Sequence, residues 1–415
     1  MEKWIECKIS DIGTVVGGAT PSTKKPENYE NGDIAWITPK DLSSFSGRYI
    51  QCGERNITEI GLKSCSTQLL PKNTVLFSSR APIGYVAIAE NAVCTNQGFK
   101  SVIPNEDTDP IFLYYLLKYN KDKIESMGSG TTFKEVSGNT MKNIVVSVPQ
   151  DKQVQEKIAS VLDAIDEKIE ENERINNNLE QQAQLLFKSW FVDFEPFNGT
   201  MPSDWEVVPF EKIVDFQNGY AFKSKELLNE PSSDCYQVFK QGHIARGGGF
   251  IPDGTKSWYP KKLASKLERF VLKKGDILMA MTDMKNNVAI LGNTAIMPID
   301  NEYIVNQRVG HLRVNGYKGI TYPFIYLLTN STDFLIDLRS RANSGVQVNL
   351  SSAEIKASQT VLPSEKVNTA FSEITFPMFE AIISNQLENQ RLAQLRDTLL
   401  PKLMSGELDV SDVDL

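Results

Sequence analysis

The sequence of 415 residues predicts an α+β protein in which two mixed, β-rich domains are separated by two long antiparallel coiled-coil helices. Three observations indicate this fold class. The sequence repeats itself once, each copy opens with short alternating apolar runs, and each copy ends with an apolar pattern of helical period. A duplication of this kind also predicts a pseudo-two-fold relation between the two halves.

The internal repeat consists of short matches that follow the same order in both halves. Each match is weak by itself, but seven matches in one order indicate duplication. The matched pairs are WIECKISDIGTVVGGAT at Trp4 and WEVVPFEKIVDFQNGYAF at Trp205, LPKNTVLFSSR at Leu70 and VLKKGDILMAM at Val271, Asn96-Gln97 and Asn306-Gln307, FLYYLL at Phe112 and FIYLL at Phe324, Gly128-Ser129-Gly130 and Asn343-Ser344-Gly345, VSVP and TVLP ending at Pro149 and Pro363, and Leu185-Leu186 and Leu399-Leu400.

Four segments follow from the change of pattern along the chain. Residues 1–150 and 196–363 carry short alternating runs that are punctuated by Gly, Pro and Asn. This pattern predicts curved, mostly antiparallel β structure with a few helices, one of them from Pro110 to Glu125. Residues 151–195 and 364–415 predict a central and a C-terminal helical spacer region.

The two helical segments show the apolar seam of a coiled coil, with steps of four and three residues. A helix from about residue 151 to 190 would be about 60 Å long. Pro377 lies inside the second segment and should kink that helix or delay its start. The first seam comprises Ile158, Leu162, Ile165, Ile169, Leu179, Ala183, Leu186 and Trp190, with Asn172 and Asn176 midway. The second comprises Phe371, Ile374, Met378, Ala381, Leu392, Leu395 and Leu399, with Asn385 and Glu388 midway.

Polar residues in the middle of a seam cost stability but fix register and partner choice. Two long helices with such imperfect seams favour antiparallel pairing with each other. The alternative is that each helix only packs on its own domain.

Composition and cysteine usage indicate a cytoplasmic protein. Apolar runs such as Ile111 to Leu117 are too short to span a bilayer, and the first residues, MEKWIECK, carry charges where a signal peptide needs an apolar stretch. Five cysteines without a C-x-x-C pair indicate reduced core thiols.

The net charge of −8 does not exclude a nucleic-acid partner, because it is unevenly distributed. The two helical segments carry net charges of −6 and −5, whereas residues 1–150 are neutral and residues 196–363 carry +3. Binding of a polyanion depends on the local field within about 10 Å. The β-rich segments therefore remain candidates for DNA binding.

No catalytic constellation is recognisable in the sequence. It has neither a G-x-x-x-x-G-K-[ST] loop nor a G-x-G-x-x-G, and no cluster with metal-ligand spacing. The Asn-Pro-Pro-aromatic motif of amino-methyltransferases is missing as well. His243 and His311, the only two histidines, are expected to be structural or surface residues.

Basic and amide residues near predicted turns are candidates for DNA contacts. Seven basic residues between Lys256 and Lys274, with Trp258 and Tyr259 among them, suit a surface that follows phosphates, although a solvated lysine-rich loop is an equal alternative. Arginine pairs with guanine and asparagine or glutamine with adenine. The candidate residues are Lys40, Arg80, Lys134, Arg246, Lys256, Lys261, Lys262, Lys266, Lys285, Asn286 and Arg308. Asn96-Gln97 and Asn306-Gln307 recur in both copies, which favours a role in the shared scaffold.

The helical segments resemble those of specificity subunits of type I restriction-modification systems. The residues that carry the resemblance are QQAQLLFKSWFVDFEPF from Gln181, LRDTLLPKLMSGELDV from Leu395, VPQDKQVQEKIASVLDAIDEKIEENE from Val148, the opening Trp, and SGTTFKEVS from Ser129. The resemblance covers the whole chain. One departure is LPSEKVNTAF after Pro363, which lacks the Gln-x-x-Ile pattern of Gln155 to Ile158.

This resemblance implies a non-catalytic subunit that recognises double-stranded DNA with a bipartite site. Each β-rich segment would be a target recognition domain for one half-site, and the helices would set the spacer and dock two modification subunits. Those partners would carry S-adenosylmethionine and methylate adenine, and restriction subunits would bring ATP and Mg for translocation and cleavage. The docking and spacer residues would be Ile158, Leu162, Ile165, Ile169, Leu179, Leu186, Trp190, Leu392, Leu395 and Leu399.

Two other classes of protein remain as alternatives. A coiled-coil scaffold with tandem protein-binding modules would explain the duplication without DNA. A self-contained methyltransferase or nuclease would need the cofactor loop or metal carboxylates that the sequence lacks.

Overall fold

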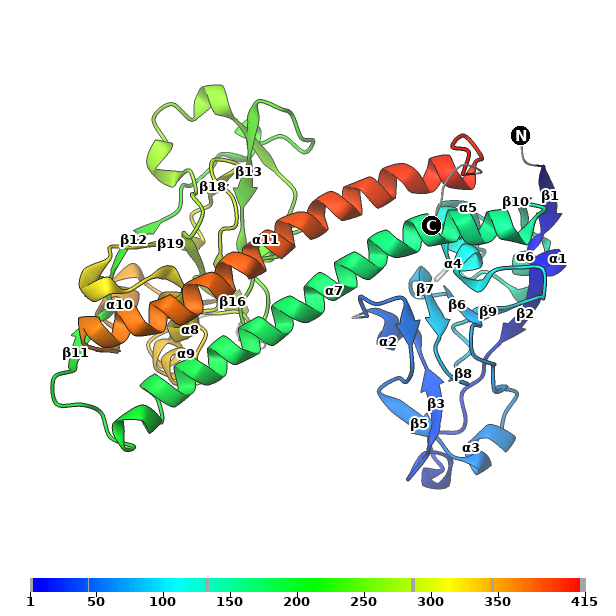
Figure 1. The fold of residues 1–415 in the computed structure, drawn as a ribbon, viewed down its shortest axis with the longest axis horizontal. Helices are drawn as coiled ribbons and strands as arrows, with labels where there is room; N and C mark the ends of the chain where they lie inside the picture. Colours follow the sequence, from blue (N-terminus) through cyan, green and yellow to red (C-terminus); the bar gives the residue numbers. More distant parts are fainter. Residues whose placement is uncertain (1–2, 44, 131–133, 285–287, 345–346, 411–415) are drawn as a thin grey trace. The chain divides into compact units, whose positions relative to one another are not determined.

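The computed structural model describes residues 3–43, 45–130, 134–284, 288–344 and 347–410. The chain forms two compact units. Unit 1 comprises residues 1–171 and 389–415, and unit 2 comprises residues 172–388. Both boundaries fall inside the two long helices, α7 (Lys152–Phe191) and α11 (Glu365–Met404), so each unit contains part of both (Figure 1). The four segments predicted from the sequence stay a prediction, because these units divide the helices differently.

Unit 1 is built from three sheets and short helices that precede α7. Its strands are β1 (Trp4–Lys8), β2 (Gly13–Gly17), β3 (Ile34–Ile37), β4 (Tyr49–Ile50), β5 (Arg55–Ile57), β6 (Val75–Ser79), β7 (Ile83–Ala89), β8 (Cys94–Thr95), β9 (Lys100–Pro104) and β10 (Val145–Pro149). Its shorter helices are α1 (Ile9–Ile12), α2 (Pro39–Ser43), α3 (Glu59–Lys63), α4 (Pro110–Tyr119), α5 (Lys121–Ser126) and α6 (Gly138–Asn143).

Unit 2 repeats this plan before α11. Its strands are β11 (Glu206–Pro209), β12 (Val214–Asn218), β13 (Cys235–Phe239), β14 (Trp258–Pro260), β15 (Ile277–Ala280), β16 (Thr282–Met284), β17 (Thr294–Ile296), β18 (Tyr303–Val305), β19 (Val309–Val314), β20 (Asn343–Ser344), β21 (Gln347–Asn349) and β22 (Gln359–Leu362). Its shorter α-helices are α8 (Tyr322–Thr329), α9 (Thr332–Ser340) and α10 (Ser352–Ala357).

The strand orders of the two units correspond, which supports the duplication predicted from the sequence. The sheet β2-β9-β6-β7-β4 of unit 1 corresponds to β12-β19-β15-β17 of unit 2. In β5-β3-β8 and in β14-β13-β18 the central strand is antiparallel to one neighbour and parallel to the other. The terminal pairs β1-β10 and β11-β22 are both antiparallel. Mostly antiparallel pairing agrees with the alternating runs in the sequence.

The start of each long helix is tied to its unit by one buried amide side chain. Gln155 of α7 donates to Pro149 O at 3.1 Å and accepts from Asp109 N at 3.1 Å. Asn368 of α11 donates to Pro363 O at 3.2 Å and to Lys318 O at 3.1 Å. Asn368 thus takes the place of Gln155, and the start of α11 is held without the Gln-x-x-Ile pattern.

Helix α11 starts at Glu365, twelve residues before Pro377, so its start is not delayed. Of the two effects expected from Pro377, the delayed start does not occur, and the kink stays a prediction. A proline inside a helix removes one donor, and its ring crowds the carbonyl four residues earlier. Here the buried side chains of Phe371, Phe379 and Ile383, on both sides of the proline, hold the helix against unit 2.

The two long helices pair in antiparallel fashion within each unit. In unit 1 Asn389 donates to Ile169 O at 3.2 Å, and Arg396 pairs with Asp166 at 2.7 Å. In unit 2 Asn385 and Asn176 share a hydrogen bond of 2.9 Å. Residues further along α11 therefore meet earlier residues of α7, as the seams predicted.

Aromatic packing anchors α7 and α11 in the core of unit 2. The ring centroid of Phe191 lies 4.8 Å from that of Phe371, 5.1 Å from Phe324 of α8 and 5.8 Å from Trp205. Burial of large side chains is the dominant stabilising contribution. In unit 1 the same role falls to Ile158 and other aliphatic residues that pack on α4.

Candidate nucleic-acid interface

The recurring Asn-Gln pairs lie at the same place in both units and belong to the scaffold. Asn96 N donates to Ile37 O at the end of β3, and Asn306 N donates to Phe239 O at the end of β13, both at 3.0 Å. A glycine approaches each turn so closely that a Cβ would clash: at Gly18 it would lie 2.3 Å from Asn96 O, and at Gly219 2.1 Å from Asn306 O. In each unit the turn lies against the glycine that follows β2 or β12 and bonds to the end of β3 or β13, which agrees with a role in the shared scaffold.

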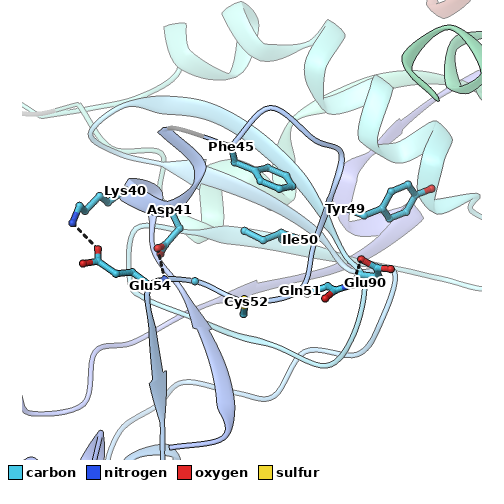
Figure 2. A pocket seen from close by; sticks show the side chains of 10 residues that line it. Lys40, Asp41, Phe45, Tyr49, Ile50, Gln51, Cys52, Glu54 and Glu90 are labelled. Carbon is cyan, nitrogen blue, oxygen red and sulfur yellow. Dashed lines mark hydrogen bonds and ion pairs between the residues drawn. The ribbon is translucent and has the colours of Figure 1, made fainter. Parts of the chain in front are cut away.

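Lys40 follows β3 and lies beside a surface pocket of unit 1. Its Nζ donates to Glu54 Oε2 at 2.6 Å, and the two side chains are 78% and 65% exposed. The pocket has a volume of about 570 Å³, and Phe45 and Tyr49 also line it (Figure 2). Asp41, Glu54 and Glu90 also line this pocket, and Lys40 is the one basic residue among its described lining residues. The excess of negative charge makes the pocket a poor site for a phosphate.

Arg80 lies close to Glu135, which follows Lys134 in the chain. Arg80 pairs with Glu135 in an isolated antiparallel bridge, and their side chains approach to 3.7 Å. Lys100 reaches the same carboxylate at 3.3 Å. Lys134 precedes Glu135 and is exposed. Two basic side chains, Arg80 and Lys100, therefore approach the carboxylate of Glu135.

The lysine-rich stretch of unit 2 is exposed but does not act as one patch. Lys261 Nζ lies 5.1 Å from the centroid of the Tyr236 ring, and Lys256 lies 3.7 Å from Asp253. Lys262 and Lys266 are exposed on the same turns. Lys274, by contrast, is held by Glu380 of α11 at 2.6 Å. The candidates Lys261, Lys262 and Lys266 thus form the part that remains available to phosphates.

The remaining candidates of unit 2 are in loops. Arg246 is exposed before three glycines, and Arg308 is exposed between β18 and β19. Lys285 and Asn286 lie outside the described residues. All the predicted DNA contacts, in either unit, stay predictions.

The helix residues assigned to spacing and docking differ in their environment. Ile158 and Leu162 are buried in the core of unit 1. Ile165, Ile169, Leu179, Leu186, Trp190, Leu392 and Leu399 are partly buried. Leu395 is 47% exposed, and Leu185 of α7, which was not among the predicted residues, is 67% exposed. These two leucines face solvent in this chain.

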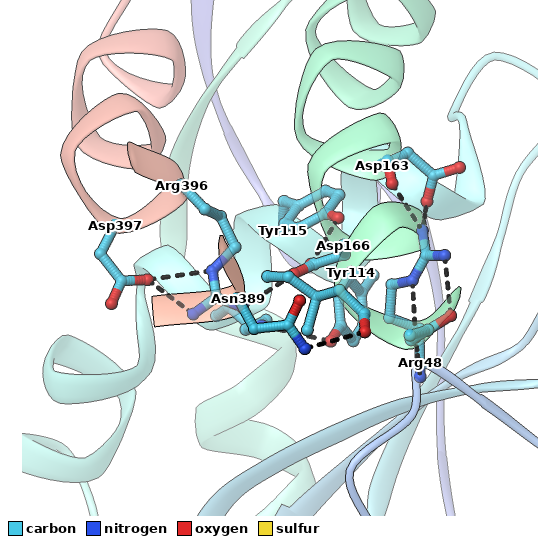
Figure 3. Close-up of polar contacts among 11 residues, drawn as sticks. Arg48, Tyr114, Tyr115, Asp163, Asp166, Asn389, Arg396 and Asp397 are labelled. Atoms are coloured by element: carbon cyan, nitrogen blue, oxygen red, sulfur yellow. Dashed lines mark hydrogen bonds and ion pairs between the residues drawn. The ribbon is translucent and has the colours of Figure 1, made fainter. Parts of the chain in front are cut away.

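A charged cluster that sequence reasoning missed fixes both helices to unit 1 (Figure 3). Arg48, only 3% exposed, donates to both carboxylate oxygens of Glu170 at 3.0 Å and also contacts Asp163. Asp166 accepts from Tyr115 and from Arg396, each at 2.7 Å.

The cluster extends to Lys118 of α4, whose Nζ donates to the Tyr114 hydroxyl at 3.2 Å. Burial lowers the pKa of Lys118, and nearby Asp166 opposes this effect. The acidic residues of α7 gave no signal of these contacts in the sequence. Only their pairing with Arg48, more than a hundred residues away, could have revealed the cluster.

The described part of the chain offers neither a membrane-spanning helix nor a metal site. Across the five described ranges, no helix combines the length and apolar character that a bilayer crossing requires. No group of three or more His, Cys, Asp or Glu side chains in those ranges is arranged to hold a metal ion. The two histidines are buried, in agreement with a structural role.

One known protein family matches both copies of the internal repeat. The family model of the type I restriction modification DNA specificity domain matches residues 1–181 and again residues 202–396. The chain belongs to this family. It is therefore a specificity subunit for DNA sequence recognition, and in type I systems catalysis lies in other subunits.

Similar proteins match over nearly the full length. The MjaIX specificity subunit of Methanocaldococcus jannaschii is 35% identical, over 99% of this chain and 94% of that protein. The HindI specificity subunit of Haemophilus influenzae is 23% identical, over 98% and 100%. The crystal structure of the S subunit from M. genitalium covers 97% of this chain and 96% of its own, with a TM-score of 0.62 at 19% identity. This likeness confirms the predicted fold class.

Proposed function

We propose that this specificity subunit reads a bipartite double-stranded DNA site, one half-site by each unit. The observation that carries the proposal is the double match of one DNA specificity domain to two units of corresponding strand order. Two related readers in one chain suit a site with two separate halves, as dimeric DNA binders suit paired half-sites.

The paired helices set the number of unread base pairs between the half-sites. Support comes from two helices of 40 residues each, which pair through specific polar contacts in both units. Such contacts fix register, so the helices act as a ruler and not as a flexible linker.

The helices also dock two modification subunits, and restriction subunits join that complex. Exposed apolar side chains along both helices support docking: Leu185, Ile374, Phe376 and Leu395 are between 41% and 67% exposed. S-adenosylmethionine belongs to the modification subunits, and ATP and Mg belong to the restriction subunits. The complex acts on chromosomal DNA in the cytoplasm.

Methylation mapping of the host genome tests the proposal. Long-read sequencing with the gene present should show methyladenine in both halves of one bipartite motif, and deletion of the gene should abolish it. Restoring the gene on a plasmid is the control for effects of the deletion on neighbouring genes. Methylation that survives the deletion unchanged would contradict the proposal.

A further inference from the structure

A three-stranded ribbon in unit 2 presents a row of amide side chains. Thr282 of β16 lies opposite Asn349 of β21, which lies opposite Asn343 of β20. Residues directly opposite each other share one face of a sheet. Met284 and Gln347 form the next row on that face.

The opposite face of this ribbon packs on the protein. Along β21 and beyond, exposed Gln347 and Asn349 alternate with Val348 and Leu350, which are only 8% and 3% exposed. The carboxylate of Asp283 also points away from the amide row, because it accepts hydrogen bonds from Ile290 N and Ala289 N at 2.8 Å. The outer face is therefore uncharged and rich in amides.

Unit 1 has two isolated antiparallel bridges at the corresponding place, which form a shorter ribbon with different side chains. Glu135 lies opposite both Arg80 and Ser129. A helix with a serine N-cap follows in both units: Ser137 accepts from Thr140 N at 3.0 Å, and Ser351 accepts from Glu354 N at 3.1 Å.

The strand that enters each ribbon is held in the same way. Ser79 N donates to Gly98 O at 2.7 Å, and Met281 N donates to Arg308 O at 3.3 Å. The row of Arg80, Glu135 and Ser129 thus corresponds to the row of Thr282, Asn349 and Asn343.

The two copies share some residues and differ at others, and the two groups of residues have different places in the fold. Where the Asn-Gln turns keep the same residues and the same hydrogen bonds, the ribbons keep only the backbone and exchange charged for amide side chains. A protein that reads two different half-sites with one duplicated frame needs such exchanged positions on its outer surface.

We infer that these two ribbon faces read base edges in the major groove, a role that rests on the proposed function. A ribbon of strands fits that groove, which is about 12 Å wide. Arg80 pairs with guanine in the half-site of unit 1, because Glu135 is shared with Lys100 at 3.3 Å and does not neutralise the row. Asn349 and Gln347 pair with adenine in the half-site of unit 2.

The test is enrichment of bound sequences from a randomised duplex DNA library by the purified full-length chain. Wild-type protein should enrich a motif with two halves. Arg80→Ala should lower the preference for one guanine by about 5- to 150-fold and leave the other half unchanged. Asn349→Ala with Gln347→Ala should lower adenine preference in the other half only.

Matched controls remove the same chemistry elsewhere on each unit. Lys63→Ala removes an exposed cation of unit 1, and Gln359→Ala removes an exposed amide of unit 2. Both should retain the wild-type motif. An unchanged thermal unfolding temperature confirms that the ribbon variants are folded.

The outcomes separate the two claims. Failure of the wild-type chain to enrich any bipartite motif contradicts the proposed function itself. If both ribbon variants still enrich the wild-type motif, the role of the ribbons is overturned. It is also overturned if one folded variant loses both halves of the motif at once.

Discussion

At the residue scale, the buried carboxylate of Asp276 shows how unit 2 keeps its central strands in place. Asp276 is 3% exposed and precedes β15. It pairs with Arg313 at 2.7 Å and with His311 at 2.8 Å, both on β19. Burial raises the pKa of Asp276, but the hydrogen bonds from His311 and Arg313 outweigh it, and the pKa lies below its ordinary value of 3.8.

Replacing this carboxylate should destabilise the protein in a pH-dependent way. Asp276→Asn should lower the free energy of unfolding by about 2 kcal/mol at neutral pH, because the buried carboxylate loses its charge-assisted hydrogen bonds with Arg313 and His311. A lowered folded-state pKa stabilises above the unfolded-state pKa, and this stabilisation is lost as pH falls through the folded value. Urea unfolding at pH 7 and below pH 4 should therefore show a difference that shrinks in acid.

Asp204→Asn is the matched control, because it removes an exposed carboxylate of unit 2 from the loop before β11. It should change stability by less than about 0.5 kcal/mol. A difference between wild type and Asp276→Asn that is equally large at both pH values would contradict the assigned role of the ionised carboxylate.

At the element scale, the polar contacts between α7 and α11 set their register at some cost in stability. Asn176 and Asn385 face each other at 2.9 Å, and Asn172 donates to Glu388 at 2.7 Å. An apolar pair would bury more favourably, but it would tolerate a shift by one heptad.

Asn176→Leu combined with Asn385→Leu should therefore raise the midpoint of urea unfolding while it loosens the pairing. Cysteine pairs introduced in register and one heptad out of register, in a background without native cysteines, measure the pairing by their cross-linking yields. The leucine double variant should give cross-links from both cysteine pairs, whereas the protein with both asparagines should give only the in-register cross-link. Replacing exposed Asn177 and Asn178 by alanine should leave the yields unchanged. A single product from the leucine variant would contradict a register role.

The helices were predictable because their signal is local. A seam with steps of three and four predicted residues 151 to 190, and α7 runs from Lys152 to Phe191. Pro377 did not delay the second helix, since buried Phe371 and Phe379 hold the chain against unit 2 on both sides of the proline. The predicted helix from Pro110 to Glu125 is two helices, α4 and α5, that meet at Asn120.

The ribbons could not be predicted in the same way, because their rows join residues far apart in the sequence. Arg80 meets Glu135, and Thr282 meets Asn349. The sequence analysis identified Arg80 and Lys134 as separate candidates, and only the strand pairing shows that Arg80 lies opposite Glu135, the residue after Lys134. The amides Gln347 and Asn349 had no signal at all, because isolated amides are common on any surface.

At the scale of the whole molecule, the family match shows a DNA specificity subunit, and the proposal is that its two units read separate half-sites at a spacing set by the helices. The corresponding strand order of the two units supports this proposal. The acidic charge of the helical segments agrees with this division, because it leaves DNA binding to the neutral and basic segments.

The most direct measurement of this claim is the spacer of the methylated site after a change in helix length. Insertion of four residues after Asn176 should lengthen α7 by about 6 Å. At about 3.4 Å per base pair, methylation mapping should then show the same two half-sites with one or two additional base pairs between them. The alanine variant of Asn177 and Asn178 should keep the original spacer. Methylation by the lengthened chain at the unchanged spacing would contradict the account.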